Sequence, residues 1–196
     1  VGTSSLRRRA LLLEQRPDLL VTDLRGNLDT RVARLAEGQY DAIVLAAAGL
    51  RRLGWDDEIA QMLEPPTWLP AAGQGALAIV CRTDDDDTRA LLAALEHAPT
   101  RAATTAERTL LRTLEGGCQI PIGALATVDG AHLRIHAFVA SIAGTTSVRG
   151  ESAGAVSDAE QIGAQLAHDM IARGASRILD EVRAEGEDGV PRPTAP

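Results

Sequence analysis

The chain has 196 residues, of which 45% are hydrophobic and only 2% aromatic, and its formal net charge is −7 at pH 7. This composition predicts one good core or two modest ones built from Leu, Val, Ile and Ala. No apolar run approaches the roughly 18 residues of a membrane span. The two cysteines form no CxxC pair, which argues against a zinc site or a disulfide framework. We therefore expect a cytoplasmic protein without a metal or a membrane segment.

The first half of the chain predicts alternating helices and strands joined by short loops. Such an order is typical of a parallel α/β layer. The expected elements are a helix capped by Thr3, Ser4 or Ser5 and ending near residue 15, a strand at 19–24, a helix from Asn27 to Gly38, and a strand at 41–49 that is buried on both faces.

The middle of the chain predicts a short helix at 56–63, a proline-rich passage and a buried strand at 76–82 that contains Cys81. Four consecutive aspartates at 84–87 then open a further helix, where carboxylates interact favourably with the helix dipole. A metal site at these aspartates is the weaker alternative, because nothing downstream supplies further oxygen ligands.

From about residue 99 the pattern changes to that of a small α+β domain. A helix at roughly 100–114 precedes three alternating segments that predict an antiparallel sheet, with a hairpin at Asp129-Gly130. Ser157 is expected to cap a helix that reaches about Arg173, and a further helix is expected from Ala175 to Glu185. We expect residues 186–196 to be a disordered tail, because they are polar and rich in proline.

Arginines recur where the predicted strands end. Residues 1–52 hold nine arginines and six acidic residues, a local charge of +3, so the remainder of the chain carries −10. The carboxyl ends of parallel strands form a ligand crevice, and the forked guanidinium suits carboxylates and phosphates. This pattern predicts a ligand with several negative groups, and scattered solvated arginines are the alternative. The arginines concerned are Arg7, Arg8, Arg25, Arg31, Arg51 and Arg52.

The lack of lysine, the scarcity of aromatic side chains and the acidic net charge argue against nucleic acid as the anionic ligand. The glycine-rich motifs that bind phosphates are also absent from the sequence.

Cys118 lies in a Gly-Gly-Cys segment that follows a predicted helix. Its neighbours Gly116, Gly117, Gln119 and Pro121 indicate a loop, whereas a packed structural thiol usually lies in an apolar run. No histidine shows dyad or metal spacing, so a Cys-His hydrolase is poorly supported. A thiol that carries a covalently attached group fits the pattern better.

Six motifs, taken in chain order, resemble the porphobilinogen deaminase (hydroxymethylbilane synthase) family over about 180 of the 196 residues. They are VGTSSLRR, LRGN, the segment RVARLAEGQYDAIVLAAAGLRRLG, LPAAGQGA, CR and LEGGCQIPIG. The resemblance implies a transferase of tetrapyrrole and haem biosynthesis that links four porphobilinogen units head to tail and releases ammonia. It also implies a dipyrromethane cofactor held by a thioether at Cys118, in a loop that Gly116 and Gly117 make adaptable.

The resemblance further implies which side chains bind the carboxylates of the cofactor and of the growing chain. The family's catalytic aspartate has no counterpart in this sequence, so we expect no catalytic residue here and no turnover by the chain alone. The binding candidates are Thr3, Ser4, Ser5, Arg7, Arg8, Arg25, Arg31 and Arg52, with close or polar contacts from Gly49 and Gln74.

The expected fold is a partial α/β domain with a parallel sheet, like that of periplasmic binding proteins, followed by a small α+β domain with an antiparallel three-stranded sheet. By resemblance, residues 1–69 belong to the family's second domain, 70–97 return to its first domain, and 98–185 form its third. The complete protein is expected to be a monomer, of which this chain, which lacks an initiator Met, is a piece. One alternative is a solute-binding module for a small carboxylate, which would have no reason to carry Cys118 in an exposed Gly-Gly loop. A purely structural α/β fragment with inert arginines is the weaker alternative.

Overall fold

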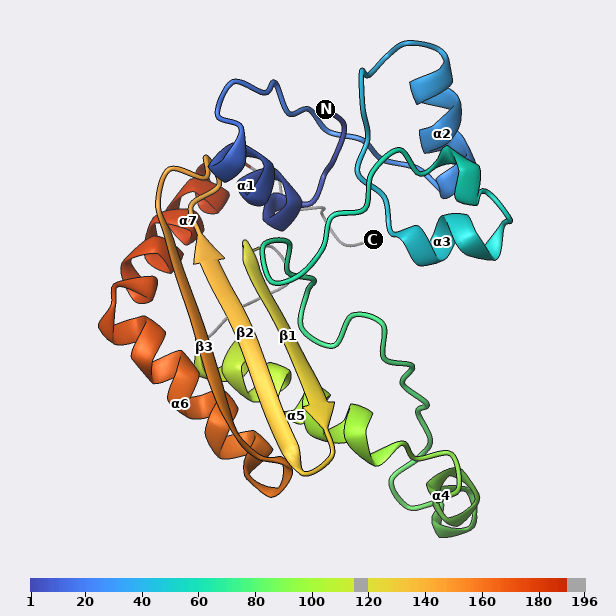
Figure 1. Cartoon of the computed structure of the whole chain (residues 1–196), viewed down its shortest axis with the longest axis vertical. Coiled ribbons are helices and arrows are strands. Elements are labelled where there is room, and N and C mark those ends of the chain that lie inside the picture. The colour runs from blue at the N-terminus through green and yellow to red at the C-terminus, as the bar shows by residue number, and fades with distance from the viewer. Residues whose placement is uncertain (115–119, 190–196) are drawn as a thin grey trace.

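The computed structural model describes residues 1–114 and 120–189, with side chains described as far as residue 185. An N-terminal part made of helices and connecting segments lies against one end of a three-stranded sheet, and the last long helices cover one face of that sheet (Figure 1). The predicted Cys118 site, with Gly116 and Gly117, lies outside the described residues.

The antiparallel sheet is confirmed. Its strands pair in the order β1-β2-β3, with Ile122 opposite Val139 in the first pair and His136 opposite Glu151 in the second. The predicted hairpin joins the first two strands, and Gly130 has a φ of 56° there. The bounds are β1 Ile122–Asp129, β2 His132–Ala140 and β3 Ser147–Ala155.

The helices expected in the C-terminal half are present and form its core with the sheet. Alternate residues of β2 face the helices, as the period of two in a strand requires. The helices are α5 Ala98–Thr113, α6 Ala159–Ala172 and α7 Ala175–Gly189. The fully buried side chains of this core include Leu110, Leu133, Ile135, Leu166 and Met170.

Two details of this half differ from the prediction. Ser157 does not cap α6, because a short 3-10 helix, Val156–Asp158, comes first and the Ser157 hydroxyl donates to Asp158 instead. Helix α7 continues to Gly189, so the expected disordered tail is wrong for residues 186–189, and residues 190–196 lie outside the described part.

The N-terminal helices begin where the capping residues predict. Ser5 caps α1 (Leu6–Gln15), and the Asn27 side chain accepts a hydrogen bond of 3.0 Å from the Thr30 N–H at the start of α2 (Leu28–Ala36). The third helix, α3, spans Ala47–Arg52.

The parallel strands predicted at 19–24 and 41–49 are reduced to single bridges. Gly2 pairs in parallel with Thr22 on one side and with Ile43 on the other. The segment around Gly2, which lies between the other two, is short because Ser5 already caps α1. The second predicted strand is cut short because α3 begins within it, at Ala47. A regular ladder therefore cannot extend along either segment.

The predicted buried strand at 76–82 is wrong. This segment has no regular structure, Leu77 is 94% exposed and Val80 is 90% exposed. Cys81, which we expected to be buried, is only half-buried. The segment pairs with no other strand in the described residues, so its apolar side chains remain in solvent.

Of the two helices predicted in the middle of the chain, one is much shorter than expected and one is confirmed. The helix expected at 56–63 is a single 3-10 turn, Asp56–Glu58. The aspartate run opens α4 (Asp86–Ala93) as predicted, with the Asp85 carboxylate accepting from the Thr88 N–H at 3.0 Å.

None of the helices within residues 1–114 and 120–189 combines the length and apolar character that crossing a bilayer requires. In the same residues, no three His, Cys, Asp or Glu side chains are grouped to hold a metal ion.

The N-terminal part and the sheet share a second, smaller core. Ala10 and Leu11 of α1 pack with Leu69 against Phe138 and Ala140 of β2, and all five are buried. This core places the middle of α1 against the sheet face opposite α5 and α6.

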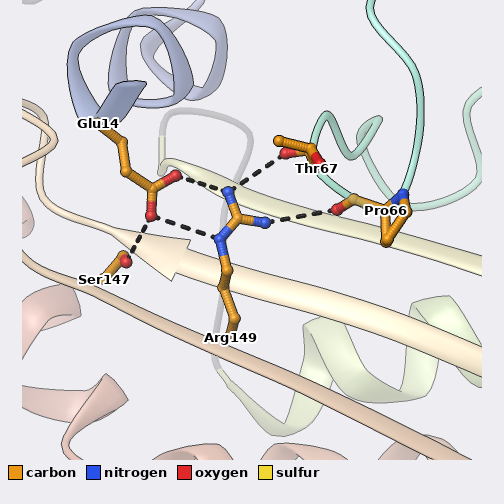
Figure 2. A network of polar contacts seen from close by, with 5 residues as sticks. All are labelled: Glu14, Pro66, Thr67, Ser147 and Arg149. Carbon is orange, nitrogen blue, oxygen red and sulfur yellow. Dashed lines mark hydrogen bonds and ion pairs between the residues drawn. The ribbon is translucent and has the colours of Figure 1, made fainter. Parts of the chain in front are cut away.

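A polar network stands beside this core, and Figure 2 shows its five residues. Arg149 on β3 donates to the Glu14 carboxylate of α1 at 2.6 Å and to the backbone oxygens of Pro66 and Thr67 at 3.4 and 3.2 Å. The Ser147 hydroxyl donates to the same carboxylate at 2.6 Å. The network therefore joins three segments that lie far apart in sequence.

Candidate functional site

Two of the three hydroxyl groups that precede α1 accept hydrogen bonds from backbone N–H groups at its N-terminus. The Ser5 Oγ accepts from the Arg8 N–H at 3.4 Å, and the Thr3 Oγ1 accepts from the Ser5 N–H at 3.2 Å. Ser4 is exposed, and its hydroxyl donates to the Leu24 oxygen at 3.0 Å. Thr3 and Ser5 thus shape the turn, and Ser4 lies at the surface.

Arg7 extends from the first turn of α1 into the interior, with only 9% of its surface exposed. Its Nη1 donates to the Leu69 oxygen at 2.5 Å, and its Nη2 donates to Gln74 Oε1 at 3.4 Å. Burial, with a smaller contribution from the charge of Arg8, lowers the pKa of Arg7 to about 10. The guanidinium is therefore still charged at neutral pH.

Arg8 lies beside Arg7 and is half-buried. Its Nη1 donates to the Val44 oxygen at 2.8 Å. Burial and then the nearby charge of Arg31 lower the pKa of Arg8. Arg31 holds its own position through a 2.8 Å bond from Nε to the Gly26 oxygen.

The structure thus brings Arg7, Arg8, Arg31 and Gln74 together, and we call the three arginines the arginine cluster. Among the residues that the structure describes, none of these three guanidiniums forms an ion pair with a carboxylate. Like charges gathered in a partly desolvated site raise its free energy until an anion binds. The cluster can therefore bind acidic groups.

The other predicted binding residues lie apart from the arginine cluster. The Arg25 side chain is 83% exposed, and its Nη2 lies 3.7 Å from an oxygen of Asp23. Arg52 is exposed at the last position of α3. Gly49 lies in the same helix, and a Cβ there would contact Leu28 of α2 at 3.4 Å, so Gly49 serves helix packing in this structure.

Glu107 was missed as a candidate, although it lies directly behind the Gln74 turn. It belongs to α5, is 5% exposed, and accepts from the Gly73 N–H at 2.6 Å and from the Ala126 N–H at 2.7 Å. Burial raises the pKa of Glu107, although both N–H bonds act in the opposite direction. The sequence signal was an acidic residue within the apolar stripe of a helix, three positions before Leu110.

Comparison with known proteins agrees with the site. Residues 1–90 match the model of the porphobilinogen deaminase dipyromethane cofactor binding domain, and residues 102–172 match that of the porphobilinogen deaminase C-terminal domain. The porphobilinogen deaminase of Desulforamulus reducens is 49% identical over 184 residues, which cover 94% of this chain and 60% of that relative. The first match contains the arginine cluster and the second contains the three-stranded sheet, and the chain belongs to the porphobilinogen deaminase family.

Proposed function

We propose that this chain is part of a hydroxymethylbilane synthase (porphobilinogen deaminase), a transferase of tetrapyrrole and haem biosynthesis. The reaction links four porphobilinogen units head to tail and releases one ammonia for each unit. The observation that carries the proposal is the arginine cluster: Arg7, Arg8 and Arg31 converge without a carboxylate partner in the described part of the chain. Each pyrrole of this substrate bears an acetate and a propionate, which are the acidic groups that such a cluster suits.

The cluster also fits the dipyrromethane cofactor of the family, because its carboxylates would neutralise the desolvated guanidiniums. When bound, that cofactor supplies the primer on which the substrate units are assembled. Cys118 would hold it covalently, and Gly116 and Gly117 would leave the loop room to approach.

The role of this chain is to bind and orient acidic groups. Arg8 and Arg31 would contact carboxylates directly, since within the described residues the side chain of each has one hydrogen-bond partner, a backbone oxygen. Arg7 is buried and held by Leu69 and Gln74, so its charge would attract the bound carboxylates without direct contact. We propose that Thr3, Ser5 and Gly49 shape the backbone around the site. Ser4, Arg25 and Arg52, which are exposed, would contact acidic groups at its rim.

We further propose that residues 1–69 are part of a domain like those of periplasmic binding proteins and that residues 70–97 pack on the family's first domain. Residues 98–185 would form its third domain. The complete protein would be a cytoplasmic monomer, and the 196 residues alone would not turn over, because the family's catalytic aspartate has no counterpart among them.

The test uses the completed enzyme, by which we mean this chain joined to the part of the Desulforamulus reducens relative that it does not cover. It should convert porphobilinogen to hydroxymethylbilane. Arg8→Leu should lower the rate at subsaturating substrate by roughly 10- to 100-fold, as expected for a lost charge-assisted hydrogen bond. Arg16→Leu, at an exposed arginine that pairs with Asp18, should not. A completed enzyme that forms no product, or equal rates for both variants, would contradict the proposal.

A further inference from the structure

The turn that presents Gln74 is built from its own backbone and side chain. The Gln74 N–H donates to the Ala71 oxygen at 3.0 Å, and the Ala71 N–H donates to Gln74 Oε1 at 3.1 Å. Gly73, at the bend, has a φ of 75°, a conformation that favours glycine. The same Oε1 accepts from Arg7, so the position of the turn decides where that guanidinium points.

Glu107 holds this turn from the interior. One carboxylate oxygen accepts from Gly73 within the turn, and the other accepts from Ala126 of β1. The Ala124 N–H donates to the Pro70 oxygen at 2.9 Å and adds a second link between the strand and the turn. The turn is therefore fixed to both α5 and β1.

A carboxylate is the group that this position requires. Two N–H donors at 2.6 and 2.7 Å need two acceptor oxygens on one side chain. A glutamine offers one oxygen and would turn its NH₂ group toward the second N–H. Because the site is buried, an N–H without an acceptor there carries its full desolvation cost.

We infer that Glu107 is a positioning residue for the arginine cluster. It fixes the Gly73 turn so that Gln74 and the Leu69 oxygen aim the Arg7 guanidinium. It also connects that guanidinium to α5, the helix that ends at Thr113, five positions before Cys118. The inference rests on the proposed function, because it assigns Glu107 a role in binding the carboxylates of the substrate and the cofactor.

The kinetic test compares Glu107→Gln with Leu110→Ala in the completed enzyme. Leu110 lies on the same helix and is fully buried, so its truncation destabilises the core without touching the turn. Glu107→Gln should raise the KM for porphobilinogen roughly tenfold, because the Arg7 guanidinium would no longer be aimed at the bound carboxylates. Leu110→Ala should leave the KM within about twofold at an equal or larger loss of melting temperature. An unchanged KM in Glu107→Gln, or an equal rise in both variants, would overturn the inference.

A second readout needs no turnover and uses the 196-residue chain. The nitrogen-15 NMR signals of the Arg7 guanidinium report its hydrogen bonds to Leu69 and Gln74. They should shift or broaden in Glu107→Gln and remain in place in Leu110→Ala. Signals that do not move in Glu107→Gln would overturn the inference even if the completed enzyme were inactive, whereas inactivity of the unmodified completed enzyme would count against the proposed function alone. If Glu107→Gln does not fold, Glu107→Asp, which draws the oxygens back by one methylene, is measured in the same way.

Discussion

Arg149 on β3 lies 2.6 Å from Glu14 on α1, an ion pair between residues 135 positions apart (Figure 2). The guanidinium also stands 5.3 Å from the centre of the Phe138 ring, within the range of a cation–π contact. Because Arg7 and Arg8 lie in the first turn of α1 (Leu6–Gln15), the pair anchors the other end of the helix that carries two of the three clustered arginines. The pair therefore links the C-terminal sheet to the helix that supplies Arg7 and Arg8.

Arg149→Met should destabilise the chain by about 1–3 kcal/mol, because Glu14 would lose its charged partner and two backbone oxygens would lose a donor. The control is Arg134→Met on β2, where the arginine lies 3.7 Å from an oxygen of Glu151 and both side chains are mostly exposed. It should cost no more than about 0.5 kcal/mol. Chemical denaturation gives the free energy of unfolding of both variants. Equal losses would show that the Arg149–Glu14 pair stabilises the fold no more than an exposed ion pair does.

The same pair should make stability depend on pH in the acid range. Burial raises the pKa of Glu14, but the hydrogen bonds from Arg149 and Ser147 and the charge of Arg149 outweigh it, so the pKa lies below its ordinary value of 4.5. A carboxyl group with a depressed pKa stabilises the fold above the unfolded-state pKa and loses that contribution as the pH falls through the folded-state value. The free energy of unfolding should therefore decrease below about pH 4.5.

Glu14→Gln should flatten this acid-side decrease, and Glu107→Gln should steepen it. The pKa of Glu107 is raised, so its contribution is present below its ordinary pKa and is lost as the pH rises through the folded-state value. Unfolding measured from about pH 3 to pH 7 distinguishes the two. Parallel pH profiles for both variants and the unmodified chain would contradict this account.

Gly144→Ala should break the contact between the turn after β2 and α1. A Cβ at this position would lie 2.5 Å from the Glu14 nitrogen and 2.7 Å from the Ala10 oxygen, and the φ of 69° is unfavourable for alanine. We expect a loss of about 3 kcal/mol or more. Gly130→Ala is a matched control, because its φ is 56° but nothing lies near the added Cβ, and it should cost about 1–2 kcal/mol. Equal losses of stability in Gly144→Ala and Gly130→Ala, measured by thermal unfolding, would contradict the close approach of Gly144 to α1.

The isolated 196-residue chain should self-associate through the segment that we first expected to be a buried strand. Leu77 and Val80 are almost fully exposed, and Leu91 and Leu95 are exposed nearby in sequence. Replacing Leu77 and Val80 by Asp should reduce the concentration-dependent mass in sedimentation or light scattering, whereas Thr127→Asp on β1 should not. A chain that is monomeric at all concentrations would contradict this expectation.

The C-terminal half could be predicted from sequence because its signals are local. Alternation along the three strands and the Asp129-Gly130 turn define the hairpin without reference to the rest of the chain. The apolar run at 76–82 was misjudged because such a run does not reveal whether a partner strand is present to pair with it. The strand predicted at 41–49 was misjudged for a related reason, since the segment forms a single parallel bridge, between Ile43 and Gly2, within the described residues.

Part of the candidate site could likewise be predicted from local sequence signals, and part could not. The positions of Arg7, Arg8 and Arg31 at the ends of predicted elements were enough to group them. Sequence spacing did not indicate that Arg25 would be exposed beside Asp23. The role of Glu107 depends on a turn 34 positions earlier in the chain, which no local pattern connects to it.

The mass of the completed enzyme, measured intact and as peptides, tests directly whether this chain holds the cofactor. We expect a dipyrromethane adduct on the peptide that contains Cys118. Cys81→Ser should keep the adduct, because that thiol has no role in the account, and Cys118→Ser should lack the thioether while remaining folded. An unmodified Cys118 in enzyme that makes hydroxymethylbilane, or a normal thioether adduct in Cys118→Ser, would contradict the assignment of the cofactor to this residue.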